Sequence, residues 1–111
     1  MKTAGEKVRV ADWIQARVPA PPEALSRRIS EVVGDDAFGS PALLPQLLIG
    51  RAEEMLTHIG DDRSSATDLL VADALITYAM EAAAEYSLDV EAIAENVALR
   101  LATVSSRGGQ A

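Results

Sequence analysis

The sequence predicts a compact all-α domain of five helices, of which the first two are short and the last three are longer. Apolar residues recur at helical spacing between residues 10 and 104. Prolines and glycines separate the first four helical segments, and Asp89 marks the start of the fifth. No stretch shows the alternation of apolar and polar residues that is typical of a half-buried strand. The chain has 111 residues, so we expect a single domain over 1–111 with flexible ends at 1–6 and 105–111.

Two short helices are expected before residue 35. In the first, apolar residues fall at positions i, i+3, i+4 and i+8, and Pro19 ends the pattern. A second helix begins near Pro22, because proline suits the first helical position, and Gly34 is expected to end it. The apolar residues are Val10, Trp13, Ile14 and Val18 in the first helix, and Leu25, Ile29, Val32 and Val33 in the second.

A third helix is expected from Pro45 to Ile59, after a short turn at 41–44. Pro45 would lie inside any helix that started at Ser40, and an interior proline removes a backbone hydrogen bond. Gly60 is expected to end this helix. Its apolar face consists of Leu48, Ile49, Ala52, Met55, Leu56 and Ile59.

Residues 65–86 predict a central helix that is almost completely buried. Apolar residues cover more than half of its circumference, whereas the apolar stripe of an ordinary surface helix is about 100° wide. Several neighbours must therefore enclose this helix, either within one chain or in a dimer. The apolar residues in question are Val71, Ala72, Leu75, Ile76, Ala79, Ala82 and Ala83.

The last helix is expected to begin after Asp89, whose side chain suits the N-cap position. Leu88 and Ile93 have the spacing of a hydrophobic staple across that cap, which strengthens the prediction. The inner face of this helix is expected to consist of Val90, Ile93, Ala94, Val97, Leu101 and Val104.

Charge and composition argue against several classes of function. The formal net charge is −7, and nucleic-acid binding needs clustered Lys and Arg, so we expect no nucleic-acid partner. The chain has no cysteine for a disulfide or a thiolate metal site. Polar residues interrupt its longest apolar stretch and its first ten residues lack the apolar run of a signal peptide, so we expect a cytoplasmic protein without a membrane span.

A single polar seam follows the central helix at i, i+4 spacing. The polar seam consists of Asp73, Thr77, Glu81 and Glu85. Helical bundles bind metals through inward carboxylates and a Glu-x-x-His motif, but here the single histidine, His58, follows Glu54 by four residues. We therefore expect no metal, no cofactor and no catalytic residue, and we expect the seam to face solvent or a subunit. Its expected basic partners are Arg27, Arg28 or Arg100.

Trp13, Leu47 and Leu99 are candidates for a subunit interface. Leu47 and Leu99 fall on otherwise polar sides of their helices, and Trp13 lies on a short helix that offers it little cover. Single exposed apolar residues are common, but the wide apolar surface of the central helix favours association.

The leading hypothesis is a non-enzymatic homodimer that works through protein–protein contact. One alternative is a small-ligand or metal-binding protein, or an enzyme, that uses the polar seam with Glu54 and His58. The other alternative is a subunit or regulatory partner of a larger assembly.

Overall fold

The structure, a computed structural model, describes residues 7–17, 19–59, 64–86 and 88–108. This part of the chain contains five α-helices, as the sequence predicts, and the first two are the shorter ones. The prediction of a compact all-α domain is confirmed. The helices are α1 (Val10–Gln15), α2 (Glu23–Val33), α3 (Leu44–Thr57), α4 (Ser64–Glu85) and α5 (Val90–Gly108).

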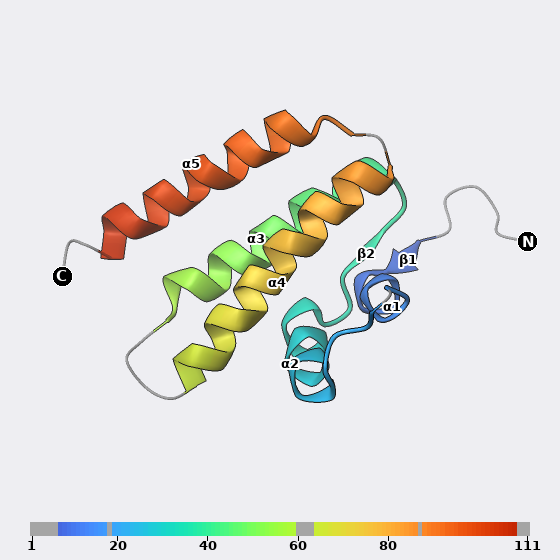
Figure 1. Ribbon diagram of the computed structural model, residues 1–111, viewed down its shortest axis with the longest axis horizontal. Helices are drawn as coiled ribbons and strands as arrows, with labels where there is room; N and C mark the ends of the chain where they lie inside the picture. Colours follow the sequence, from blue (N-terminus) through green and yellow to red (C-terminus); the bar gives the residue numbers. More distant parts are fainter. Residues whose placement is uncertain (1–6, 18, 60–63, 87, 109–111) are drawn as a thin grey trace, which may run out of the picture.

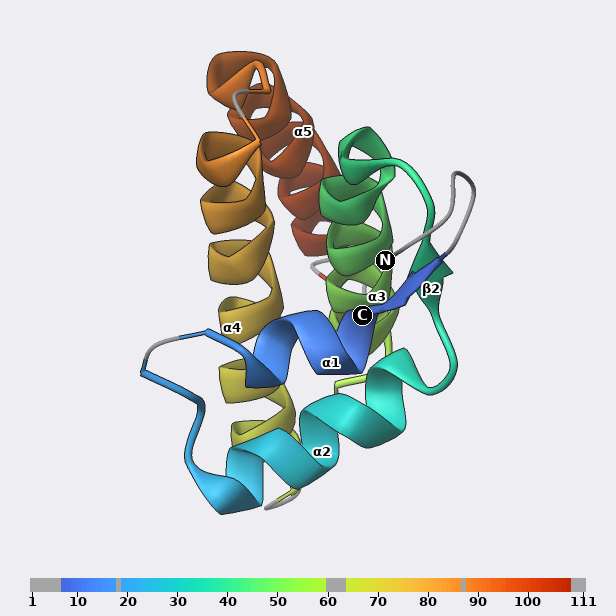
Figure 2. The ribbon, with the colours of Figure 1, turned by 90° about the vertical axis from the view of Figure 1, so that its right-hand side faces the viewer.

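The helices α3 and α4 form an antiparallel pair at the centre of the molecule (Figure 1). This pair makes the most extensive packing contact between any two helices. Figure 2 shows α1 and α2 crossing one side of the pair, with α5 on the opposite side. The three layers together measure 51 × 31 × 22 Å along the principal axes.

Local sequence signals account for most of the helix ends. Gly34 follows α2 with φ +52° and ψ −122°, a backbone conformation that residues with a Cβ rarely adopt. The backbone N–H of Ala92 donates to Asp89 Oδ1 at 3.0 Å, so Asp89 is the N-cap of α5. A 3₁₀ turn at Pro41–Leu43 precedes α3 and leaves Pro45 in the first turn of that helix, where it is tolerated.

Some boundaries differ from the expected ones. The helix α3 ends at Thr57 rather than Ile59, because His58 has already left the helical conformation with φ −111° and ψ 8°. The helix α5 extends to Gly108, although the sequence predicts a flexible end from residue 105. The other expected end, 1–6, lies outside the described residues, and so do 109–111, Val18 and Gly60.

A two-stranded antiparallel pairing was not expected from the sequence. The strands β1 (Val8–Arg9) and β2 (Ala37–Phe38) pair Val8 with Phe38 and Arg9 with Ala37. Each strand has two residues, which is too short to show an alternating pattern. The pairing holds the start of α1 against the connection between α2 and α3, where Val10 N also donates to Asp36 O at 2.9 Å.

The buried face of α4 forms the middle of the core. Val71, Leu75 and Ala79 are completely buried, which confirms the prediction for this side of the helix. The burial is nevertheless incomplete in the single chain, because Leu69 is 50% exposed and Leu70 is 60% exposed. The expectation of an almost completely buried helix therefore has to be corrected at Leu69 and Leu70, although Val71 and Ala72 in the same half of α4 are buried.

Candidate functional site

The C-terminal half of the polar seam is ion-paired with Arg17, the residue that follows α1 by two positions. Arg17 Nη2 donates to Glu81 Oε1 at 3.0 Å, and Arg17 Nη1 donates to Glu85 Oε1 at 2.5 Å. The expected partners lie elsewhere. Arg27 pairs with Glu23, Arg28 with Glu31 and Asp68, and Arg100 with Glu53.

Trp13 explains why Arg17 reaches the polar seam. The guanidinium carbon of Arg17 lies 4.4 Å from the centre of the Trp13 ring, a cation–π contact. Trp13 Nε1 donates to Tyr86 Oη at 3.1 Å, and the Trp13 ring meets Tyr78 edge-on with centroids 6.3 Å apart. The indole therefore fixes α1 against α4 and positions the Arg17 side chain between two carboxylates.

These contacts shift the pKa values of neighbouring groups. The hydrogen bond from Arg17 holds the pKa of the Glu85 carboxyl below its ordinary value, against a smaller effect of desolvation. Burial raises the pKa values of Tyr78 and Tyr86. Both phenols are thus neutral at pH 7, and the Tyr86 hydroxyl can accept the hydrogen bond from Trp13.

The N-terminal half of the polar seam borders a hollow in the surface. Thr77 Oγ1 donates to the backbone oxygen of Asp73 at 3.0 Å, and the Asp73 carboxylate is exposed. The hollow has a volume of about 330 Å³ and opens to solvent. It is lined by Pro19, Asp73, Ala74, Thr77, Tyr78 and Glu81.

The structure does not bring His58 and Glu54 to the polar seam. His58 follows α3, with Nδ1 2.8 Å from the Glu54 backbone oxygen and 3.1 Å from Thr57 Oγ1. The Glu54 carboxylate binds Arg51 at 3.0 Å. Neither residue lines the hollow beside Asp73. Within the described ranges, no three His, Cys, Asp or Glu side chains converge as a metal site would require.

The three candidate interface residues have different surroundings. Trp13 is 8% exposed and is enclosed by its own chain, so its side chain has little surface left for a partner. Leu47 is half-buried against the core. Leu99 is 69% exposed on α5. The exposure of Leu69 and Leu70 was not expected from the sequence, because both residues belong to a helix whose wide apolar surface predicts neighbours on nearly all sides.

A second, apolar hollow lies where α3, α4 and α5 meet. Leu56, Ile76 and Leu101 line it, one from each helix. Leu101 is 38% exposed, whereas Ile93 and Val97, nearer the start of α5, are buried. In Figure 1 the C-terminal half of α5 diverges from the N-terminal half of α4. The inner face of α5 is therefore only partly covered.

Among the described residues, no helix combines the length and the apolar character needed to cross a membrane. Comparison with protein-family models, curated proteins and solved structures finds no match to this chain.

Proposed function

We propose that this protein acts through protein–protein contact and self-associates as a homodimer. The contact would use an apolar surface formed by Leu56, Leu69, Ile76 and Leu101, which we call the α4–α5 surface. The observation that carries the proposal is the 38% exposure of Leu101 at the apolar hollow, together with the 50% exposure of Leu69 on the side of α4 that carries the hollow-lining Ile76.

Helix geometry supports treating these residues as one surface. Leu69 precedes Ile76 by seven residues, which places both on the same side of α4. Leu101 follows Val97 by four residues on the inner side of α5. At the rim, Arg100 pairs with Glu53 at 3.6 Å, which gives the apolar surface a polar border. An apolar patch with a polar rim is typical of protein contact sites.

The size of the domain also favours association. A chain of 111 residues hides a smaller share of its surface than a larger domain does. Its central helices pack through alanines, since Ala72, Ala79, Ala82 and Ala83 are all buried. Pairing two copies through the α4–α5 surface would add leucine and isoleucine burial to this thin core.

Sedimentation of the purified protein at micromolar concentration tests the proposal. We expect a species of twice the 11.7 kDa chain mass. Leu101→Gln should weaken the dimer about 10- to 50-fold, because full burial of a leucine contributes about 1.5–3 kcal/mol and each of the two copies would newly bury the 38% of Leu101 that is exposed. Circular dichroism should show that the variant keeps its helix content.

Leu99→Gln is the matched control on the same helix. Leu99 lies two residues before Leu101, so their side chains project from opposite sides of α5. We expect this variant to remain dimeric. A monomer at every concentration, or equal weakening by both substitutions, would contradict the proposed surface.

A further inference from the structure

The helix α5 is held against α3 and α4 by a small apolar contact. On its inner side Ile93 and Val97 are buried, whereas Val90 and Leu101, which flank them along the helix, are each 38% exposed. The apolar hollow between α3, α4 and α5 lies beside this contact. Burial of apolar surface is the main force that holds one helix on another. A contact with so few buried side chains therefore holds α5 weakly.

A buried asparagine weakens the contact further. Asn96 lies three residues after Ile93 and four residues before Arg100, on the inner side of α5. Its Oδ1 is buried, and none of the described residues donates a hydrogen bond to it. A buried oxygen without a partner costs free energy, which is recovered when the helix leaves and water reaches the amide. The ion pair of Arg100 with Glu53 compensates little, because these side chains are 34% and 36% exposed.

The helices on the opposite side of the α3–α4 pair are attached more firmly. There Ile14 and Ile29 are 0% and 1% exposed. Arg28 Nε donates to Asp68 Oδ1 at 3.0 Å, which joins α2 to α4, and Arg17 joins the end of α1 to α4 through two carboxylates. The two sides of the central pair therefore differ in how much holds them to it.

The peptide between Leu88 and Asp89 has the properties of a pivot. Leu88 N donates to Ala83 O at 2.8 Å and the Leu88 side chain packs against the core, so Leu88 belongs to the end of α4. Asp89 accepts from Ala92 N through Oδ1 and from Ile93 N through its backbone oxygen, so Asp89 belongs to α5. A rotation at this peptide breaks none of these hydrogen bonds.

We infer that α5 undocks from α3 and α4 as one unit, pivoting between Leu88 and Asp89 while the rest of the chain stays folded. Undocking separates Leu101 from Leu56, Leu69 and Ile76, so the α4–α5 surface exists only while α5 is docked. This consequence rests on the proposed homodimer: a second copy that binds the docked state increases its population. The docking of α5 then regulates whether a chain can dimerise.

Thiol labelling tests the inference, since the chain has no cysteine of its own. Full-length variants with Ile93→Cys, Val97→Cys or Ala52→Cys place a single thiol at a buried position on α5 or under it on α3. We expect 5,5′-dithiobis(2-nitrobenzoic acid) to label all three through one common opening. Because this opening exposes less surface than global unfolding, its rate should depend only weakly on urea.

Val33→Cys is the matched control, because it is the same substitution as Val97→Cys at a buried position of α2. Its thiol should react only when the whole chain unfolds. We expect its labelling to be at least about tenfold slower than that of Val97→Cys and to depend more steeply on urea.

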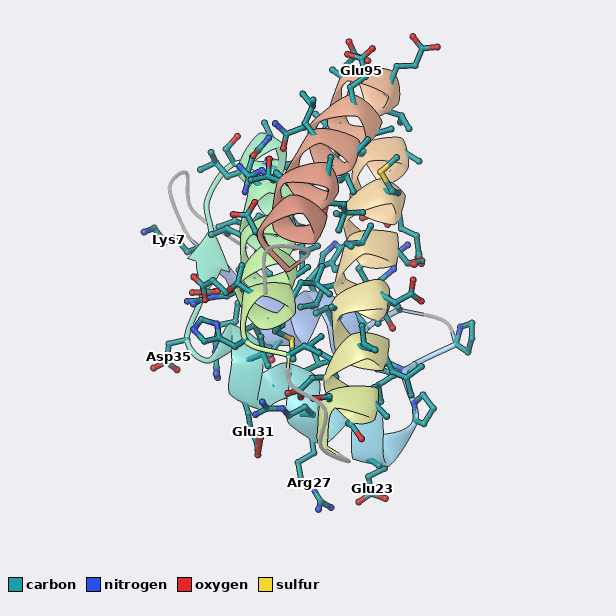
Figure 3. All side chains as sticks on the ribbon, turned by 90° about the vertical axis from the view of Figure 1, so that its left-hand side faces the viewer. Lys7, Glu23, Arg27, Glu31, Asp35 and Glu95 are labelled. Atoms are coloured by element: carbon teal, nitrogen blue, oxygen red, sulfur yellow. The ribbon has the colours of Figure 1, made fainter. Side chains whose placement is uncertain are left out.

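A second pair of variants tests the role of Asn96. Leucine has the branched shape of asparagine without its polar atoms, so adding Asn96→Leu to Ala52→Cys should slow labelling about fivefold or more. Glu95→Leu is the control, because Glu95 projects from the exposed side of α5 (Figure 3). It should change the labelling rate less than twofold.

Three results would overturn the inference. Labelling of Val97→Cys as slow and as urea-dependent as that of Val33→Cys would show that α5 opens only with the whole chain. Fast labelling of Val97→Cys with protected Ile93→Cys and Ala52→Cys would indicate fraying of the end of α5 alone. Equal effects of Asn96→Leu and Glu95→Leu would remove the buried amide as a cause.

Protein concentration separates this inference from the proposed homodimer. If a second copy holds α5 in place, labelling of Ala52→Cys should slow as the concentration rises. Labelling that is fast at every concentration would contradict the homodimer and support undocking. Labelling as slow as that of Val33→Cys at every concentration would contradict undocking, whatever the oligomeric state.

Discussion

Arg17 joins α1 to α4 through two carboxylates and one aromatic ring. Its side chain is 21% exposed and that of Glu85 is 41% exposed, so solvent screens the pair and its contribution to stability is about 1 kcal/mol or less. Replacing Glu85 by Gln should therefore lower the free energy of unfolding by this amount at pH 7. Urea unfolding followed by Trp13 fluorescence measures the change.

The effect of this substitution should depend on pH in a defined direction. The folded-state pKa of Glu85 is lowered, chiefly by the hydrogen bond from Arg17. The stabilisation is thus fully present above the unfolded-state pKa of about 4.3 and is lost as the pH falls through the lower folded-state value. Wild type and Glu85→Gln should converge once the pH falls below the folded-state pKa of Glu85. Glu95→Gln, at an exposed position beyond the first turn of α5, should show no comparable convergence. A difference between wild type and Glu85→Gln that persists at low pH would contradict the role of the Glu85 carboxylate.

The sequence predicts the composition of the polar seam but not the cation that binds it. Positions 73, 77, 81 and 85 lie on one side of any helix through this segment, so helical periodicity is sufficient to find them. Arg17 is distant in sequence and follows the end of α1, where no periodic pattern constrains the direction of its side chain. The packing of Trp13 against Tyr78 and Tyr86 decides that direction, and it arises only in the folded chain.

The connection between α2 and α3 depends on the backbone of Gly34. At φ +52° and ψ −122° a side chain is strained even though the space around Gly34 is open. Gly34→Ala should destabilise the protein by about 1–2 kcal/mol, which shifts the midpoint of urea unfolding downward.

Gly50→Ala is the natural control for this substitution. Gly50 lies within α3, and an added Cβ would have nothing within 4 Å there. Because alanine has the higher helix propensity, Gly50→Ala should raise stability by up to about 1 kcal/mol. If both variants moved in the same direction, backbone conformation at Gly34 would not be the cause.

The five helices were predictable from the sequence, but their exact ends and the burial of their surfaces were less so. Apolar spacing and caps such as Asp89 are local signals, and they identified the helices α1 to α5. The strands β1 and β2 were not predicted, because a two-residue pairing depends on long-range contact between residues 8–9 and 37–38. Periodicity showed that α4 has a wide apolar surface, but it could not show that Leu69 and Leu70 would remain exposed.

At the scale of the whole molecule, the three-layer arrangement leaves α5 incompletely packed. Its inner face buries Ile93 and Val97 but leaves Leu101 38% exposed. If a second copy covers this region, folding and association are coupled, and the stability of the chain depends on its own concentration. The thermal midpoint should then rise by a few degrees for each tenfold increase in protein concentration, because mass action favours the folded dimer. In Leu101→Gln the thermal midpoint should rise less with protein concentration, whereas in Leu99→Gln it should rise as in the wild type. Differential scanning calorimetry over a hundredfold concentration range distinguishes the two cases, since the midpoint of a protein that folds as a monomer does not change with concentration.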